Sequence, residues 1–291
     1  MATVTPFAGI RFDPARAGDP GGLLADAAEW RPLARRPGQE GRPAPGGSIP
    51  AAPDDAPVGR GDGRPHAARL FSDWAGTLAG DWLSRGVLVR DEPPTLYVYR
   101  GQRPVPPELR HGPGVPEAAA CLAVAAVLQV DGAGAVKLAQ AVDARAVEPM
   151  MPVMKAFAMD VAPVWALFAR ASAGPRQARL DQLLTGAISG SDPVLATEQP
   201  VGTSHRLWRL DPAAAAELAE ILSQLPVVVA QGGLQVEALR RLAAQSPGGR
   251  INGVPPAVLA LLTPADAPPA AGQTPALLPV HRLLLASSGL D

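Results

Sequence analysis

The chain has 291 residues, of which 47% are apolar and 18% are charged, so it is long and apolar enough to bury a hydrophobic core. Its formal net charge is −1, which excludes a global electrostatic basis for binding nucleic acid or an anionic membrane surface. The single cysteine, Cys121, excludes an internal disulfide, and no signal segment or membrane-spanning run is evident, so we expect a cytoplasmic protein.

The N-terminal part of the chain divides by composition. Residues 1–30 form a first region, in which the alternation of apolar and other residues at 6–12 favours a half-buried strand. Residues 31–65 are dominated by Pro, Gly, Arg and Asp, and too few apolar side chains offset the entropy of ordering, so we expect a flexible segment. We place the main α/β domain at 66–291. It begins with an amphipathic helix at 66–85, whose Leu and Trp side chains recur every four residues as a core face.

The middle of the chain predicts a series of short strands. Strands at 87–89 and 96–99 flank a turn rich in acidic residues and proline. The runs 118–130 and 135–142 are joined by the turn sequence Asp-Gly-Ala-Gly, which predicts that they pair as a hairpin. A methionine-rich helix follows near residue 150, and we expect it to pack against the sheet.

The second half of the chain alternates strands with helices. Asp211 followed by Pro212 is typical of a helix start, with the aspartate as N-cap and the proline in the first turn. The expected strands are 164–168, 195–198, 205–210 and 277–285, and the expected helices are 177–185, 211–225 and 255–262. This alternation favours an α/β or α+β fold, with a mixed sheet, hairpins and flanking helices.

Residues 225–244 contain a strand, a Gly-Gly turn and a helix. Three consecutive valines at 227–229 predict a buried strand, Gly232 and Gly233 end it, and an amphipathic helix follows. Such a turn presents backbone N–H groups at a helix N-terminus, where the helix dipole favours an anion such as phosphate. Neither the dinucleotide fingerprint nor the P-loop motif is present, so a tight connection without a ligand is the alternative.

Two further patterns occur within the first hundred residues. Residues 6–12 read P-F-A-G-I-R-F. The pattern G-x-L-x-x-D-x-x-P-x-L-Y-V-Y is formed by Gly86, Leu88, Asp91, Pro94, Leu96, Tyr97, Val98 and Tyr99. These patterns, with a His-Arg pair at His281 and Arg282, resemble the bacterial family catalogued as domain of unknown function 1015.

The resemblance also concerns the Gly-Gly turn. There the family carries A-D-G-H-H-R-Y, which is similar to the Asp-Gly-x-His-Arg turn of the ParB and sulfiredoxin-like fold, whose members bind nucleotides and in some cases transfer a phosphoryl group. The resemblance therefore implies a ParB/sulfiredoxin-like core and ATP or another nucleotide as ligand. In this chain the same positions, 230–236, read A-Q-G-G-L-Q-V, so the charged positions are neutral. Gln231 can neither accept a proton nor supply a formal negative charge.

Two main hypotheses for the function stay open, and a nucleotide-gated switch resembling ParB is a third, disfavoured because a basic nucleic-acid surface is missing. The first is a non-catalytic, degenerate member of the family with a binding or regulatory role and a protein partner. The second is a nucleotide-dependent phosphotransferase acting on a small metabolite, with Asp211, His281 and Arg282 in new roles. No metal site is expected, because the four histidines lack ligand spacing. The candidate anion- or nucleotide-binding residues are Gln231, Gly232, Gly233, Gln235, His281 and Arg282.

Overall fold

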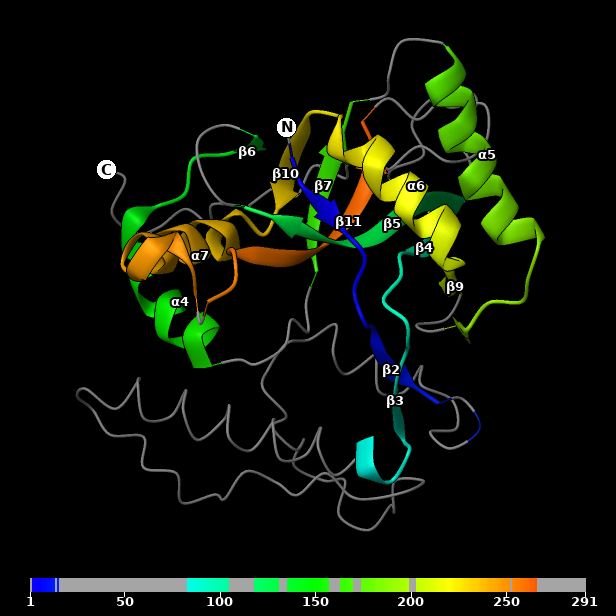
Figure 1. Ribbon diagram of the computed structural model, residues 1–291, viewed down its shortest axis with the longest axis horizontal. Helices are drawn as coiled ribbons and strands as arrows, with labels where there is room; N and C mark the ends of the chain where they lie inside the picture. Colours follow the sequence, from blue (N-terminus) through cyan, green and yellow to red (C-terminus); the bar gives the residue numbers. More distant parts are fainter. Residues whose placement is uncertain are drawn as a thin grey trace, which may run out of the picture.

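The computed structural model describes residues 2–13, 15, 83–104, 118–130, 135–156, 163–169, 174–198, 203–251 and 253–265. These ranges form a nine-stranded mixed sheet, a separate two-stranded sheet and four α-helices (Figure 1). The expected fold, with a mixed sheet and flanking helices, is confirmed. The strands are β1 (Val4–Thr5), β2 (Ile10–Phe12), β3 (Leu88–Arg90), β4 (Tyr97–Pro104), β5 (Ala118–Gln129), β6 (Val136–Leu138), β7 (Val164–Phe168), β8 (Leu195–Thr197), β9 (Ser204–Arg209), β10 (Val227–Gln231) and β11 (Ala257–Pro264). The helices are α4 (Ala144–Ala156), α5 (Pro175–Ser189), α6 (Pro212–Ser223) and α7 (Gly233–Ala244), with a 3-10 turn, η2, at Pro247–Gly249.

The large sheet has the strand order β6-β10-β7-β11-β5-β4-β9-β8, and β1 adds to β5. Two pairings are parallel, β6 with β10 and β7 with β11, and the others are antiparallel. The long strand β5 has β4 and β1 along one edge and β11 along the other. The second sheet consists of β2 and β3 alone.

Two predictions about the strands are wrong. The runs 118–130 and 135–142 do not form a hairpin, because both edges of β5 are occupied and β6 pairs instead with the outer edge of β10. Residues 255–262 do not form a helix, because most of this run lies in β11, between β5 and β7. A short run that is apolar throughout has no period that separates a buried strand from a helix, so its environment decides the structure.

The helices form as their sequence signals predict. The Asp211 carboxylate accepts hydrogen bonds from the N–H groups of Ala213 and Ala214, which confirms the N-cap of α6. α6 buries Leu218 and Leu222 almost completely. Full burial of one leucine contributes about 1.5–3 kcal/mol, so this face holds the helix in place. α5 packs beside α6 and also contacts β4 and β9.

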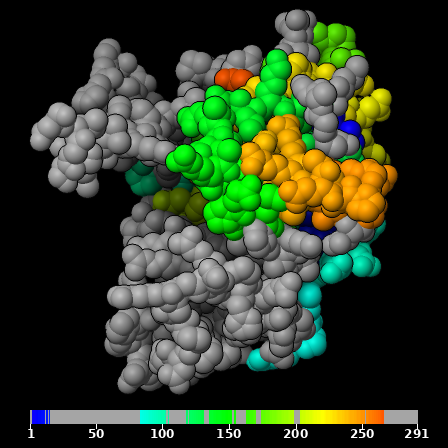
Figure 2. Space-filling model, turned by 90° about the vertical axis from the view of Figure 1, so that its left-hand side faces the viewer, coloured from blue at the N-terminus to red at the C-terminus, as the bar shows by residue number. Residues whose placement is uncertain are grey.

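The methionine-rich helix packs against both another helix and the main core. In α4, Val147 and Met151 form a small apolar cluster with Ala238 and Leu242 of α7, while Met154 also packs against the core that the sheet strands line. Figure 2 shows α4 in green and α7 in orange packed together on one flank of the molecule. Cys121, in β5, is half-buried.

Several predicted segments lie wholly or largely outside the described residues. They are the flexible segment at 31–65, the helix at 66–85 and the strand at 277–285. In the ranges that are described, no helix is both long and apolar enough to cross a membrane. The strands predicted at 87–89 and 96–99 are confirmed as β3 and the start of β4.

Candidate functional site

The Gly-Gly turn connects β10 to α7 as the sequence predicts. Gly232 is the N-cap residue of α7 and has φ 90° and ψ 16°, in the left-handed region that favours glycine. Its carbonyl oxygen accepts hydrogen bonds from the N–H groups of Gln235 and Val236, which closes the first turn of the helix. A β-carbon at this position would lie 2.7 Å from Val164 Cγ1, so the turn packs directly against β7. Conformation and packing both require glycine here.

The surroundings of the turn are mostly apolar. A β-carbon added to Gly233 would contact Val142 and Leu138, and one added to Gly232 would meet Gln235 Oε1 as its polar neighbour. Gln231, the last residue of β10, is exposed, and Gln235 is half-buried. Four of the six predicted binding residues are therefore brought together, and they supply amide groups and backbone N–H groups.

The other predicted participants do not join this turn in the described structure. His281 and Arg282 lie outside the described residues. Asp211 follows β9, and five strand-to-strand steps separate β9 from β10 in the sheet. At about 4.8 Å a step, this separation is roughly 24 Å. The Asp211 carboxylate also caps α6, so this residue has a structural role at a distant point of the sheet.

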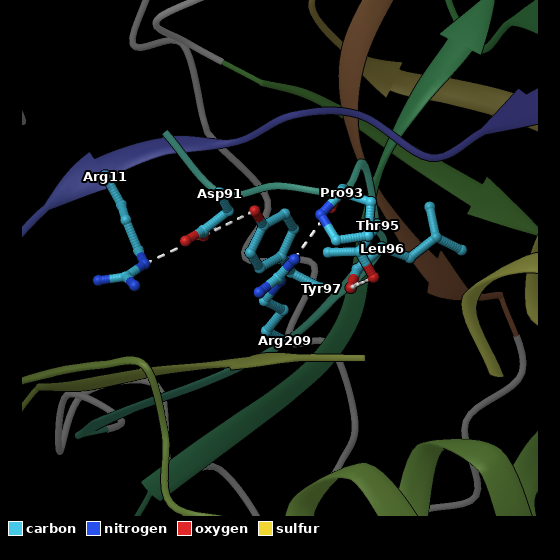
Figure 3. A network of polar contacts seen from close by, with 7 residues as sticks. All are labelled: Arg11, Asp91, Pro93, Thr95, Leu96, Tyr97 and Arg209. Atoms are coloured by element: carbon cyan, nitrogen blue, oxygen red, sulfur yellow. Dashed lines mark hydrogen bonds and ion pairs between the residues drawn. The ribbon is translucent and has the colours of Figure 1, made fainter. Parts of the chain in front are cut away.

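A second polar site lies where β2 and β3 meet β4 (Figure 3). Asp91 is 6% exposed, and its Oδ2 atom accepts hydrogen bonds from Arg11 Nε at 3.0 Å and from the Tyr97 hydroxyl at 2.8 Å. Arg209 donates from Nη2 to the Pro93 carbonyl oxygen, while its buried Nε atom has no hydrogen-bond partner among the described residues. We call Arg11, Asp91, Tyr97 and Arg209 the polar network.

The Tyr97 ring is held in place by packing, and this position sets where its hydroxyl meets Asp91. The ring is 2% exposed, lies 5.2 Å from the Phe7 ring, and would clash with a β-carbon at Gly9. Burial raises the pKa of the Tyr97 hydroxyl well above its ordinary value, and the hydrogen bond to Asp91 and the charge of that carboxylate raise it further. The backbone of Gly9 and the charge of Arg209 act in the opposite direction. Tyr97 is therefore a neutral hydrogen-bond donor at physiological pH.

This network was not predicted from the sequence, although three of its four members belong to the two patterns at 6–12 and 86–99. Gly9 and Arg11 belong to the pattern at 6–12, and Asp91 and Tyr97 belong to the pattern at 86–99. A usable signal was present, because the pattern at 6–12 includes an arginine and the pattern at 86–99 includes an aspartate. A buried carboxylate needs a partner, and the arginine of the other pattern is the natural candidate.

A third polar contact joins β4 to β9. The Tyr99 hydroxyl lies 2.7 Å from Nδ1 of His205. The Tyr99 ring packs close to Gly101, where an added β-carbon would lie 3.0 Å from Tyr99 Cζ. Ser204 precedes His205 on the same strand and points to the opposite face, as expected for neighbours in a strand. No group of three or more His, Cys, Asp or Glu side chains that could hold a metal ion occurs among the described residues.

Comparison with protein families gives one match. The family model described as "Protein of unknown function (DUF1015)" matches residues 71–291. The chain belongs to the DUF1015 family. The DUF1015 match includes the Gly-Gly turn and three members of the polar network, while Arg11 lies before its first residue. Searches of curated proteins and of solved structures found no match.

Proposed function

We propose that the protein is a non-catalytic member of the DUF1015 family with a binding or regulatory role. The observation that carries the proposal is the composition of the Gly-Gly turn. A β-carbon added at either glycine would meet Val164, Val142, Leu138 or the amide of Gln235 first, so these nearest side chains among the described residues offer neither a general base nor a carboxylate for a metal ion. In the sequences that this chain resembles, the same turn carries an acid, two histidines and an arginine.

The acidic residues near the ends of the strands support the same proposal. Asp91 is buried and already bonded to Arg11 and Tyr97, and Asp211 is occupied as a helix cap. Both carboxylates are thus engaged in hydrogen bonds within the fold. The retained charged groups therefore hold the fold, and binding is the function that the turn can still perform.

The ligand that fits the turn is an anionic group, such as the phosphate of a nucleotide. The N-terminus of a twelve-residue helix offers backbone N–H groups and a partial positive charge. A nucleotide would bind there without being consumed, and a protein partner would respond to the bound state. A ParB/sulfiredoxin-like relation belongs to this proposal and rests on the resemblance of the turn sequence alone.

Calorimetric titration with ATP, ADP and CTP, with and without Mg²⁺, tests the proposal. Gly233→Glu places a carboxylate at the first position of α7, where the helix dipole tolerates it but an anionic ligand is repelled. Gly186→Glu is the matched control, because nothing lies within 4 Å of a β-carbon at that glycine of α5. We expect binding that Gly233→Glu abolishes and Gly186→Glu preserves. Absence of binding at millimolar nucleotide, or equal loss in both variants, would refute a ligand site at the turn.

A further inference from the structure

Two exposed arginines lie opposite each other on neighbouring strands of the large sheet. Arg100 in β4 and Arg206 in β9 are Cα partners in the antiparallel pairing of these strands. Directly opposed residues on adjacent strands point to the same face, with β-carbons about 4.5–5.5 Å apart. Both side chains are exposed, so the two guanidinium groups project into solvent from one point of the sheet.

The described residues that pair with these arginines across the sheet are neutral. Arg206 faces Ala196 of β8 on its other side, and Arg100 faces Leu122 of β5. The next pair on the same face is Gln102 with Ser204, whose polar side chains continue the surface along the strands. Across the sheet, the residues in register are therefore Ala196, Arg206, Arg100 and the half-buried Leu122.

The arginine pair has no carboxylate partner within the described ranges. Arg11, Arg179 and Arg241 form ion pairs there. Three more arginines, Arg209, Arg240 and Arg250, donate to backbone carbonyl groups. Neither kind of contact occurs for Arg100 or Arg206 in the described part of the chain, and Glu198, just after β8, pairs with neither.

Two arginines directly opposite each other on a sheet are unfavourable when no anion lies near them. Like charges directly opposite on a sheet repel each other and destabilise the pairing. Arginine presents several N–H donors in a planar fork that matches two oxygen atoms of a phosphate group. Two such forks can bind one phosphate from two sides, because the two arginine side chains start from neighbouring β-carbons on the same face of the sheet.

We propose that Arg100 and Arg206 form a binding site for the phosphate group of a small molecule, with Gln102 and Ser204 as additional polar contacts. This site is separate from the Gly-Gly turn, since β10 is five strand-to-strand steps from β9 and four from β4. It also lies on the opposite face of β4 from Tyr97 and Tyr99, which alternate with Arg100 along the strand. The inference therefore goes beyond the proposed function and does not depend on it.

Calorimetric titration of the full chain with pyrophosphate tests this site. We expect Arg100→Gln and Arg206→Gln each to weaken binding about tenfold, which corresponds to the loss of one charge-assisted hydrogen bond. Arg145→Gln is the matched control, because Arg145 is an exposed arginine in α4. Arg100→Lys keeps the charge and loses the fork, so its affinity should fall between wild type and Arg100→Gln.

The same titration separates the two sites. Pyrophosphate binding that survives Gly233→Glu and is lost in Arg100→Gln assigns the anion to the arginine pair. Binding that is lost in Gly233→Glu and unchanged in both glutamine variants overturns the inference and assigns the anion to the turn. No binding at millimolar pyrophosphate, or the same loss in Arg145→Gln, also overturns it.

Discussion

Replacing Gly9 with alanine should destabilise the protein through the Tyr97 ring. The new β-carbon would lie 2.7 Å from Cζ of Tyr97, closer than real β-carbons approach another heavy atom. The ring has little freedom to move, because Asp91 binds its hydroxyl at 2.8 Å and its exposed fraction is 2%. Adding a methyl group to such a packed place costs about 1–3 kcal/mol in the free energy of unfolding.

Urea unfolding of purified variants measures this cost. Gly186→Ala is the control, because a β-carbon there meets nothing within 4 Å and alanine favours the helix α5 by about 0.5–1 kcal/mol. Tyr97→Phe removes the hydroxyl that Gly9 approaches, and it also costs about 1–3 kcal/mol alone, because the buried Asp91 carboxylate loses a donor. In the double variant Gly9→Ala with Tyr97→Phe, part of the clash is relieved.

The double-mutant cycle decides whether this reasoning is right. Because the two residues are in contact, the double variant should lose less stability than the sum of the single changes, by about 0.5–3 kcal/mol. Additive costs within about 0.5 kcal/mol would refute the claim that Gly9 and Tyr97 share one packed space. A cost for Gly9→Ala below that of an ordinary surface substitution, about 0.5 kcal/mol, would refute it as well.

Three further predictions concern other parts of the fold. Gly232→Ala should cost more in urea unfolding than Gly253→Ala, about 1–3 kcal/mol more, because both have positive φ but only Gly232 is crowded by a neighbouring strand. Asp211→Ala should remove about 1 kcal/mol through loss of the α6 cap, and Asp211→Asn should largely preserve it. The raised pKa of Tyr97 predicts that stability is full below about pH 10, where an unfolded tyrosine ionises, and falls as the pH rises above it. Tyr97→Phe should flatten that alkaline loss in a pH series of unfolding curves.

The sequence predicted local structure well where a chemical signal was local. Asp211 and Pro212 indicate the start of α6, and Gly232 marks the end of β10, because capping and left-handed conformation depend on adjacent residues. The strand order of the sheet had no such signal. β6 lies next to β10 and not next to β5, and that choice depends on which strand edges are still free.

The same limit applies to the candidate sites. The four residues of the turn are close in the chain, so their proximity could be predicted from the sequence. The polar network joins Arg11 to Asp91 and Tyr97 across 80 and 86 positions, as their numbering shows. The tertiary contacts that bring them together include the pairing of β2 with β3 and the packing of Phe7 on Tyr97. The helix predicted at 255–262 was wrong because a run that is apolar throughout carries no period that separates a strand from a helix.

The most direct test of the central claim is phosphorus NMR of ATP incubated with the purified protein, Mg²⁺ and a set of small hydroxylated metabolites. A non-catalytic protein should leave the ATP spectrum unchanged over hours, while the calorimetric titration under the same conditions reports binding. Appearance of ADP together with inorganic phosphate or a new phosphate ester, at a rate that falls in Asp211→Asn or Gly233→Glu, would contradict the claim. In that case the chain would be an enzyme that uses Asp211 or the Gly-Gly turn in its reaction.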